Sequence, residues 1–186
     1  LDAISKWINK RYGVILNPET QILSLNGTRE GLFNAQIALS PETKNGKPTK
    51  VLIPNPFYQV YAVGAATVSA ETVFVPAYAE NNFMPNYSEL PKEVLDQTTI
   101  LFLCSPANPQ GTMATYEYWV ELLQLAEKHD FKIFADAGYA YHKYASLSNS
   151  LSNTLLYTYG AGIDLLSIYD FVFRVEYSRN QLKREG

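Results

Sequence analysis

The sequence predicts an α/β fold with a mainly parallel sheet and crossover helices. The first observation is that short apolar runs typical of buried strands alternate along the chain with segments of helical periodicity. The second is that turn residues follow these runs, as in Pro54-Asn55-Pro56 and Ser105-Pro106-Ala107-Asn108-Pro109. The third is the length of 186 residues, which suits one domain with a sizeable core.

The N-terminal quarter of the chain predicts a helix, a strand and a second helix. Residues 2–12 carry an apolar stripe that ends at Gly13, a residue typical of helix ends. Residues 21–25 alternate between polar and apolar side chains, which predicts a short strand. Apolar residues then return at helical spacing from residue 32 to residue 37. A turn at Asn26-Gly27-Thr28-Arg29 therefore joins a predicted strand to a predicted helix.

The middle of the chain continues the alternation. A polar loop spans residues 41–50, and no feature marks it as a domain linker. Strands are predicted at 51–53, 71–76, 99–104 and 132–135, and helices at 57–66, 90–97 and 115–128. Residues 146–159 show no clean period and residues 163–175 are apolar, so the segment after residue 139 is left unassigned.

Composition limits the classes of function. A net charge of −3 with scattered basic residues argues against nucleic-acid binding. No apolar run has the length of a membrane span, and neither His129 nor His142 lies in a metal-ligand pattern. The single cysteine, Cys104, lies inside an apolar run, which favours a reduced, cytoplasmic location and a small buried side chain. Because the chain begins at Leu1 within a helical pattern, we expect a fragment of a longer protein.

Polar and aromatic residues follow the ends of several predicted strands. In open α/β sheets the carboxyl ends of parallel strands meet at one edge, where ligands bind. At the Gly27 turn, exposed N–H groups and the helix dipole favour an anion, although Thr28 would equally serve as a helix cap. Tyr58 follows the strand at 51–53 and could cover a flat ligand. The alternative is that Phe57, Tyr58 and Tyr61 are core aromatics, and we expect Phe57 to point into the core.

The two later strands end in the residues with the most specific chemistry. Asn108 lies between two prolines, which restrict its backbone and aim its amide. Asp136 ends a buried strand, where a carboxylate is costly unless it has a partner. The plain alternatives are a turn for Asn108 and a helix N-cap for Asp136.

Together these motifs resemble the class I/II aminotransferases, the fold-type-I enzymes that depend on pyridoxal 5′-phosphate (PLP). The Ser-Pro-Ala-Asn-Pro-Gln-Gly-Thr loop (residues 105–112) resembles the family's Asn-Pro-x-Gly motif, and Asp136 with Tyr139 resembles its Asp-x-x-Tyr motif. Each motif alone is weak, but their order and spacing are specific. Within the family the sequence most resembles the bacterial branch that includes succinyldiaminopimelate transaminase.

The resemblance implies a role for each matching residue. Gly27, Thr28 and Arg29 would hold the PLP phosphate, and Tyr58 would stack on the pyridine ring. Asp136 would pair with the ring nitrogen and keep it protonated, so that the ring can act as an electron sink. Asn108 and Tyr139 would donate hydrogen bonds to the phenolic oxygen of the ring.

The resemblance covers residues 1–139, predicted to be the PLP-binding core of the large domain, and ends in a divergent tail at residues 140–186. No catalytic residue is found, because the Schiff-base lysine and its Ser-x-Ser-Lys motif are missing. Lys143 lies too close to Asp136, Lys183 lacks the serines, and Ser146-Leu147-Ser148-Asn149 has the wrong spacing. The later phosphate-binding arginine and the small domain are missing as well.

The implied function is transfer of an amino group from an amino acid to a 2-oxo acid, in amino-acid or lysine biosynthesis. The intact protein would be a homodimer with small-molecule substrates. Three alternatives remain open: a catalytically dead fragment or pseudoenzyme, a PLP lyase or decarboxylase of the same fold, and a nucleotide-binding module. The last lacks the glycine-rich fingerprint of that class. The chain alone is expected to be inactive.

Overall fold

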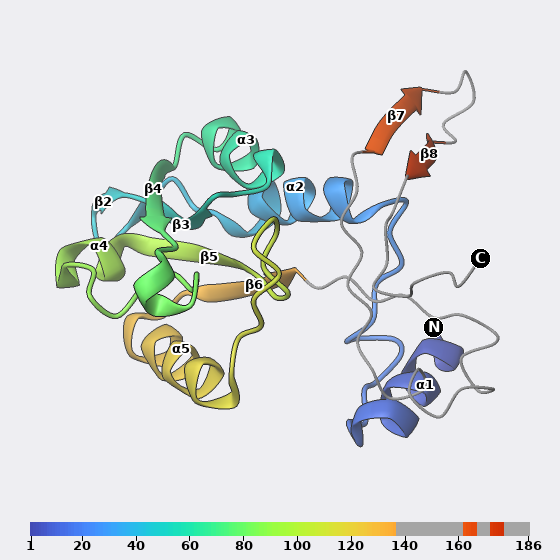
Figure 1. Ribbon diagram of the computed structural model, residues 1–186. Helices are drawn as coiled ribbons and strands as arrows, with labels where there is room; N and C mark the ends of the chain where they lie inside the picture. The colour runs from blue at the N-terminus through green and yellow to red at the C-terminus, as the bar shows by residue number, and fades with distance from the viewer. Residues whose placement is uncertain (137–161, 167–171, 177–186) are drawn as a thin grey trace, which may run out of the picture.

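The computed structural model describes residues 1–136, 162–166 and 172–176 of the chain. A four-stranded sheet in the order β4-β3-β5-β6 forms the middle layer of this structure (Figure 1). All three pairings in this sheet are parallel, which confirms the predicted fold class. The strands are β3 (Lys50–Asn55), β4 (Glu71–Pro76), β5 (Thr98–Cys104) and β6 (Lys132–Asp136).

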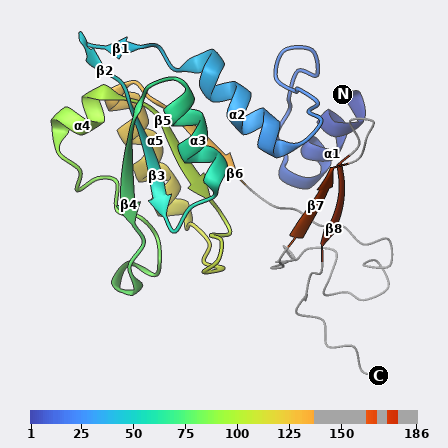
Figure 2. The same cartoon turned by 90° about the horizontal axis from the view of Figure 1, so that it is seen from above.

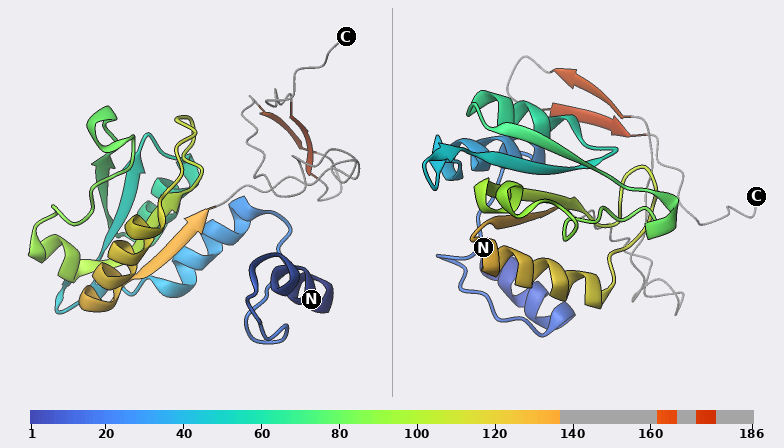
Figure 3. Two further views of the ribbon diagram at one scale, coloured as in Figure 1. Left: turned by 60° about the horizontal axis from the view of Figure 1, so that its bottom comes forward. Right: turned by 90° about the vertical axis from the view of Figure 1, so that its left-hand side faces the viewer.

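Helices cover both faces of the sheet. Helices α2 (Thr28–Leu39) and α3 (Gln59–Thr67) lie on one face, and α5 (Tyr116–His129) lies on the other, with the short α4 (Lys92–Gln97) at the start of β5 (Figures 1 and 3). Within the described ranges, none of the helices is long and apolar enough to cross a bilayer.

The remaining elements are small or lie apart from the sheet. Strands β1 (Thr43–Lys44) and β2 (Lys47–Pro48) form a hairpin, and a 3₁₀ turn, η1 (Ala79–Asn81), follows β4. Helix α1 (Asp2–Tyr12) lies away from the sheet, beyond the start of α2 (Figure 2). Strands β7 (Gly162–Leu166) and β8 (Val172–Glu176) pair with each other in antiparallel fashion.

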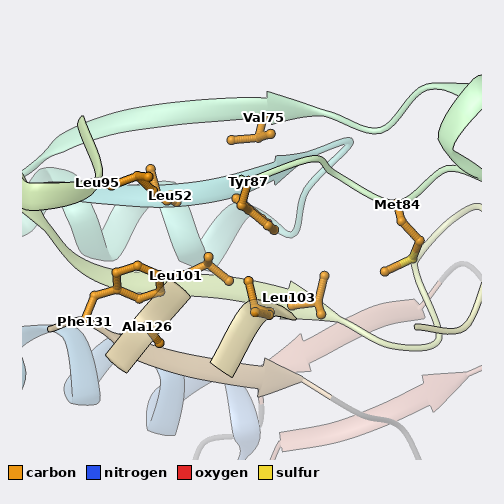
Figure 4. Close-up of a cluster of buried hydrophobic side chains, with 10 residues drawn as sticks. Leu52, Val75, Met84, Tyr87, Leu95, Leu101, Leu103, Ala126 and Phe131 are labelled. Carbon is orange, nitrogen blue, oxygen red and sulfur yellow. The ribbon is translucent and has the colours of Figure 1, made fainter. Parts of the chain in front are cut away.

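The strands are continuous apolar runs because the sheet is covered on both faces. Alternate residues of the central strands β3 and β5 point into two buried clusters, one on each face of the sheet. The cluster on the α5 face includes Leu52, Leu101 and Leu103, with Tyr87 and Phe131 beside them (Figure 4). The cluster on the α2–α3 face consists of Val51, Ile53, Val60, Tyr61, Ala65, Ala70, Ile100 and Phe102. The candidate site described below grows out of this second cluster.

Helices α2 and α3 pack closely at a glycine. A Cβ atom on Gly64 of α3 would lie 1.9 Å from Nε2 of Gln36 on α2, so the position has no room for a side chain. Gln36 is fully buried and donates a hydrogen bond from Nε2 to the carbonyl oxygen of Val60, at 3.3 Å. This contact fixes the start of α3 against α2, and both helix starts contribute residues to the candidate site.

A lysine fastens the amino-terminal edge of the sheet. Nζ of Lys44 donates hydrogen bonds to the carbonyl oxygens of Thr98 and His129, both at 2.6 Å, and of Asp130, at 2.5 Å. Lysine near a helix C-terminus satisfies carbonyl groups that have no partner within the helix. The β1–β2 hairpin is thereby joined to the end of α5 and the start of β5.

Most predicted elements are present, and one is wrong. Helix α1 ends at Gly13, which has a φ of 70° and donates its N–H to the carbonyl oxygen of Asn9, as the sequence indicated. The strand expected at residues 21–25 is not formed. Leu23 is 81% exposed there, so the alternation of side chains does not correspond to a buried face, and a strand needs a partner for its backbone groups.

Candidate cofactor site

The carboxylate of Asp136 lies at the carboxyl end of β6 and has a tyrosine partner. Oη of Tyr61, in the first turns of α3, donates a hydrogen bond of 2.7 Å to Oδ2 of Asp136. In the sheet, Asp136 lies beside Cys104 of β5, and its carbonyl oxygen accepts from the N–H of Ser105 at 3.0 Å. The partner that this partly buried carboxylate requires is therefore Tyr61.

The ring of Tyr61 is held in place by aromatic neighbours. Tyr61 is fully buried and stacks on Phe102, with ring centroids 4.3 Å apart and planes inclined by 10°. Phe102 in turn stacks on Phe134 of β6, at 5.4 Å. Burial, and next the negative charge of Asp136, raise the pKa of Tyr61 well above its ordinary value. The hydroxyl group therefore stays protonated and acts as a hydrogen-bond donor.

Tyr58 connects this pair to the first turn of α2. Its ring meets the ring of Tyr61 edge-on, with centroids 5.7 Å apart. Its hydroxyl oxygen accepts a hydrogen bond from Nε of Arg29 at 2.6 Å, and the guanidinium carbon of Arg29 lies 5.8 Å from the ring centroid. Arg29, Tyr58, Tyr61 and Asp136 thus form one continuous series of contacts from α2 to β6.

The start of α2 presents backbone donors beside Arg29. Gly27 is the N-cap residue, and no side chain caps the helix. Gly27, Thr28 and Arg29 therefore lie where the first N–H groups of a helix have no partner within the helix. These groups and the positive end of the helix dipole favour an anion, and Arg29 adds a full positive charge.

Asn108 lies in the loop between β5 and α5, which folds back on itself. The N–H of Ala107 donates to the carbonyl oxygen of Thr112 at 2.7 Å, and the N–H of Gly111 donates to the carbonyl oxygen of Ala107 at 2.6 Å. Gly111 has a φ of 75°, a conformation that favours glycine. Asn108 itself is exposed at the same edge of the sheet as Asp136.

The peptide bonds preceding Pro56, Pro106 and Pro109 are cis. All three prolines belong to the loops that follow β3 and β5, at the edge of the sheet where Asp136 lies.

The structure thus brings six of the seven predicted site residues to one edge of the sheet, through the contacts of Arg29 with Tyr58 and of Asp136 with β5. The seventh, Tyr139, lies outside the described residues, as do Lys143 and Lys183. The expectation for Phe57 is wrong: it is 38% exposed and packs against Phe74, itself 45% exposed, on the edge strand β4.

Sequence reasoning missed Tyr61 as the partner of Asp136. The two residues are 75 positions apart, so no local pattern joins them. A signal was present in the spacing of Tyr58 and Tyr61, because residues three apart on a helix lie on one face. If Tyr58 lies at the site, Tyr61 faces the same edge of the sheet.

A hollow of about 230 Å³ lies away from this site, between residues 81–88 and α5. Its lining includes Tyr118, whose hydroxyl group donates to the carbonyl oxygen of Pro85 at 2.7 Å. It belongs to the α5 face of the sheet, opposite Tyr61. The chemistry of the candidate site therefore does not depend on it.

The reactivity of Cys104 offers a test of the geometry around Asp136. Burial, and next the charge of Asp136, raise the pKa of the Cys104 thiol to about 11. Only the thiolate reacts with alkylating reagents, and a free thiol has a pKa of about 8.5, so we expect alkylation about a hundredfold slower than for a free thiol at a pH of about 8. The chain has a single cysteine, so iodoacetamide uptake followed by mass spectrometry measures this rate directly.

The rate should rise about tenfold per pH unit up to a pH of about 10, as the thiolate fraction grows. Unfolding the protein in urea should restore the rate of a free thiol. Reaction of the folded protein at the free-thiol rate would contradict the burial of Cys104 at the end of β5.

The fold and the site define a class of ligand-binding α/β protein. An open parallel sheet, with polar and aromatic residues gathered on the loops after its strands, is the architecture of α/β proteins that bind a ligand at that edge. The positive end of α2, the ring of Tyr58 and the carboxylate of Asp136 suit a flat, anionic ligand with a basic nitrogen.

Comparison with known proteins assigns the family. The family model "Aminotransferase class I and II" matches residues 1–168. The chain belongs to the class I and II aminotransferase family. Members of this family generally depend on PLP, which is the kind of ligand that the site residues suit.

The relatives are similar over about three quarters of the chain. LL-diaminopimelate aminotransferase from Dehalococcoides mccartyi is 35% identical over 139 residues, which are 74% of this chain and 34% of that protein. LL-diaminopimelate aminotransferase 2 from Trichormus variabilis is 34% identical over 140 residues, 75% of this chain and 35% of that protein. The chain thus spans about a third of the length of the curated relatives it matches.

Solved structures agree with the fold. An aminotransferase from Neisseria meningitidis superposes with a TM-score of 0.67 at 32% identity, over 74% of this chain and 34% of that one. A probable N-succinyldiaminopimelate aminotransferase from Thermus thermophilus gives a TM-score of 0.66 at 30% identity, over 74% of this chain and 36% of that one. The described core therefore has the fold of part of these aminotransferase structures.

Proposed function

We propose that residues 1–139 are the PLP-binding core of an aminotransferase that transfers an amino group from an amino acid to a 2-oxo acid. The observation that carries the proposal is the contact series from Arg29 through Tyr58 and Tyr61 to Asp136. It spans the distance between an anion-binding helix start and a carboxylate, and an aromatic ring lies between them. The names of the relatives favour substrates related to diaminopimelate, hence lysine biosynthesis.

The residues present fit PLP at its phosphate, its ring nitrogen and its phenolic oxygen. Gly27, Thr28 and Arg29 offer backbone N–H groups and a guanidinium to the phosphate. Asp136 offers its carboxylate to the pyridine nitrogen, and Asn108 offers its amide to the phenolic oxygen. When bound, PLP supplies an electron sink for the bonds at the α-carbon of the amino acid. The remaining donor to the phenolic oxygen is assigned to Tyr139.

The described residues of this chain would bind and orient PLP, and none of them supplies the proton transfer. Lys44, Lys50 and Lys132 lie at the amino-terminal edge of the sheet, away from Asp136. General-base catalysis by a positioned side chain contributes roughly 10²–10⁴-fold, and a lysine nucleophile adds the covalent step. We therefore propose that the chain alone is a catalytically inactive cofactor-binding part, with residues 140–186 as a divergent tail.

Two further parts of the proposal concern the oligomeric state and the cellular location of the protein. The intact protein is proposed to be a homodimer; Ile4, Trp7 and Tyr12 of α1 are 40–55% exposed, and such apolar surface favours burial in a larger assembly. A cytoplasmic location is proposed because Cys104 is a free thiol, which suits a reducing compartment.

The test is to map where PLP attaches. The purified chain is incubated with PLP, reduced with borohydride, digested, and searched for pyridoxyl-lysine by mass spectrometry. We expect saturable, non-covalent binding before reduction, trace labelling spread over many lysines after it, and negligible transamination. A stoichiometric adduct on Lys143 or Lys183, with turnover of an amino donor and a 2-oxo acid, would overturn the proposal of an inactive part. Absence of saturable PLP binding would overturn the assignment of the site.

A further inference from the structure

We infer that Tyr61 is a positioning residue for Asp136: its hydroxyl group holds Oδ2 of the carboxylate and leaves Oδ1 for the cofactor's ring nitrogen. The inference rests on the proposed function, because it assigns a role within the same site. It adds a residue that none of the motifs of the sequence contains. Its basis is the hydrogen bond of 2.7 Å between Oη of Tyr61 and Oδ2 of Asp136.

The carboxylate needs such a partner to have one orientation. The terminal torsion of an aspartate side chain is broad and roughly two-fold, so the carboxylate plane of a strand-end aspartate is not fixed by its own geometry. A hydrogen bond to one oxygen selects one plane. The second oxygen then has a fixed direction, which is what recognition of a single N–H group in a flat ring requires.

Tyr61 can impose this orientation because it is itself immobile. The ring is fully buried, stacks on Phe102 at 4.3 Å and meets Tyr58 edge-on at 5.7 Å. Its backbone lies near the start of α3, where the N–H of Tyr61 donates to the carbonyl oxygen of Tyr58 at 3.0 Å. The hydroxyl group is therefore held at a point that is set by the core of the sheet.

The hydroxyl group is also a permanent donor. Burial and the charge of Asp136 raise the pKa of Tyr61, so it keeps its proton throughout the range in which proteins are handled. Without this donor, a partly buried carboxylate oxygen would lose a hydrogen bond that nothing else described at this position replaces. The carboxylate would then no longer be held in one plane, and its contact with the ring nitrogen would weaken.

The experiment compares PLP with its analogue in which a C–H group replaces the ring nitrogen. Dissociation constants of both ligands are measured by equilibrium titration for the wild-type chain, for Tyr61→Phe and for Tyr118→Phe. Tyr61→Phe keeps the ring that stacks on Phe102 and removes only the hydroxyl group. Tyr118→Phe removes a hydroxyl group that donates to the carbonyl oxygen of Pro85, on the other face of the sheet, and is the matched control.

We expect Tyr61→Phe to weaken PLP binding about tenfold, because the variant loses a hydrogen bond to a charged group. Binding of the analogue should change less than about twofold, because the analogue makes no bond to Asp136. Tyr118→Phe should leave both constants as in the wild type. The ratio of the two constants is taken within each protein, so a lower folded fraction of the variant affects both ligands equally and does not mimic the result.

The outcomes separate the two proposals. If the wild-type chain prefers PLP over the analogue and Tyr61→Phe keeps that preference, the role of Tyr61 is wrong and the proposed function stands. If Tyr61→Phe weakens both ligands equally, Tyr61 is a structural residue only, and the inference again fails alone. If the wild-type chain binds both ligands equally, the contact of Asp136 with the ring nitrogen is wrong and the inference fails, while PLP binding stands. If it binds neither ligand, both proposals fall.

Discussion

Replacing Phe102 with alanine should remove a large share of the free energy of unfolding. Phe102 lies in the central strand β5, is fully buried, and stacks on Tyr61 and on Phe134. Truncation of a buried phenylalanine to alanine costs about 3–5 kcal/mol through lost burial and the cavity it leaves. Domains have only about 5–15 kcal/mol of stability in total, so the loss is a large fraction of it. Urea denaturation followed by circular dichroism measures the free energy of unfolding.

The matched control is Phe74→Ala on the edge strand β4, where the side chain is 45% exposed. This change should cost less than about 1.5 kcal/mol, because little of the apolar surface it removes is buried. Phe102→Leu should likewise be mild, at under about 1.5 kcal/mol, since it keeps most of the volume. A cost for Phe102→Ala no greater than that for Phe74→Ala would contradict the packing between the sheet and α3.

Replacing Asp136 with asparagine should weaken PLP binding by about 10- to 100-fold, because hydrogen bonds to charged groups are worth about 1.5–3 kcal/mol. Asparagine keeps the shape of the side chain and a carbonyl oxygen that accepts from Tyr61, so the aromatic core should remain intact. It removes the negative charge that we propose pairs with the protonated ring nitrogen. Titration calorimetry with PLP measures the change.

The control for this change is Asp130→Asn. Asp130 precedes the start of β6, at the opposite end of the strand from Asp136. Asp130 ends α5 with a φ of 51°, a conformation that asparagine also adopts, and it is exposed. The Asp130→Asn variant should bind PLP as the wild type does. Equal affinities of Asp136→Asn and the wild type would remove Asp136 from the site, whatever the stability of the variant.

Much of the sheet could be predicted from the sequence because its two central strands, β3 and β5, are buried on both faces. The runs ending at Cys104 and Asp136 are continuous apolar segments, and such segments are typical of parallel strands under helices. Once these strands are parallel and adjacent, their carboxyl ends meet at one edge. The position of Asn108 near Asp136 then follows from chain order and needs no long-range information.

The rest depends on contacts that no local pattern encodes. Residues 21–25 have the alternation of a strand, but a strand forms only where backbone partners lie alongside. Phe57 is apolar and follows a buried strand, yet its place at the edge of the sheet leaves it to pack on Phe74 near the surface. The bond between Tyr61 and Asp136 joins residues of two distant elements, α3 and β6. Apolar character predicts burial in general and does not specify the partner.

We propose that the edge of the sheet between α2 and β6 binds PLP through its phosphate and its ring nitrogen together. The most direct measurement is the change in backbone amide chemical shifts of the isotope-labelled chain on titration with PLP. We expect saturating changes in amide chemical shift at Gly27, Thr28 and Arg29. We expect them also at Tyr58 and Asp136. Amides of residues in the hollow between residues 81–88 and α5 should remain unshifted. Shifts confined to that hollow, or scattered over surface lysines without saturation, would contradict the account.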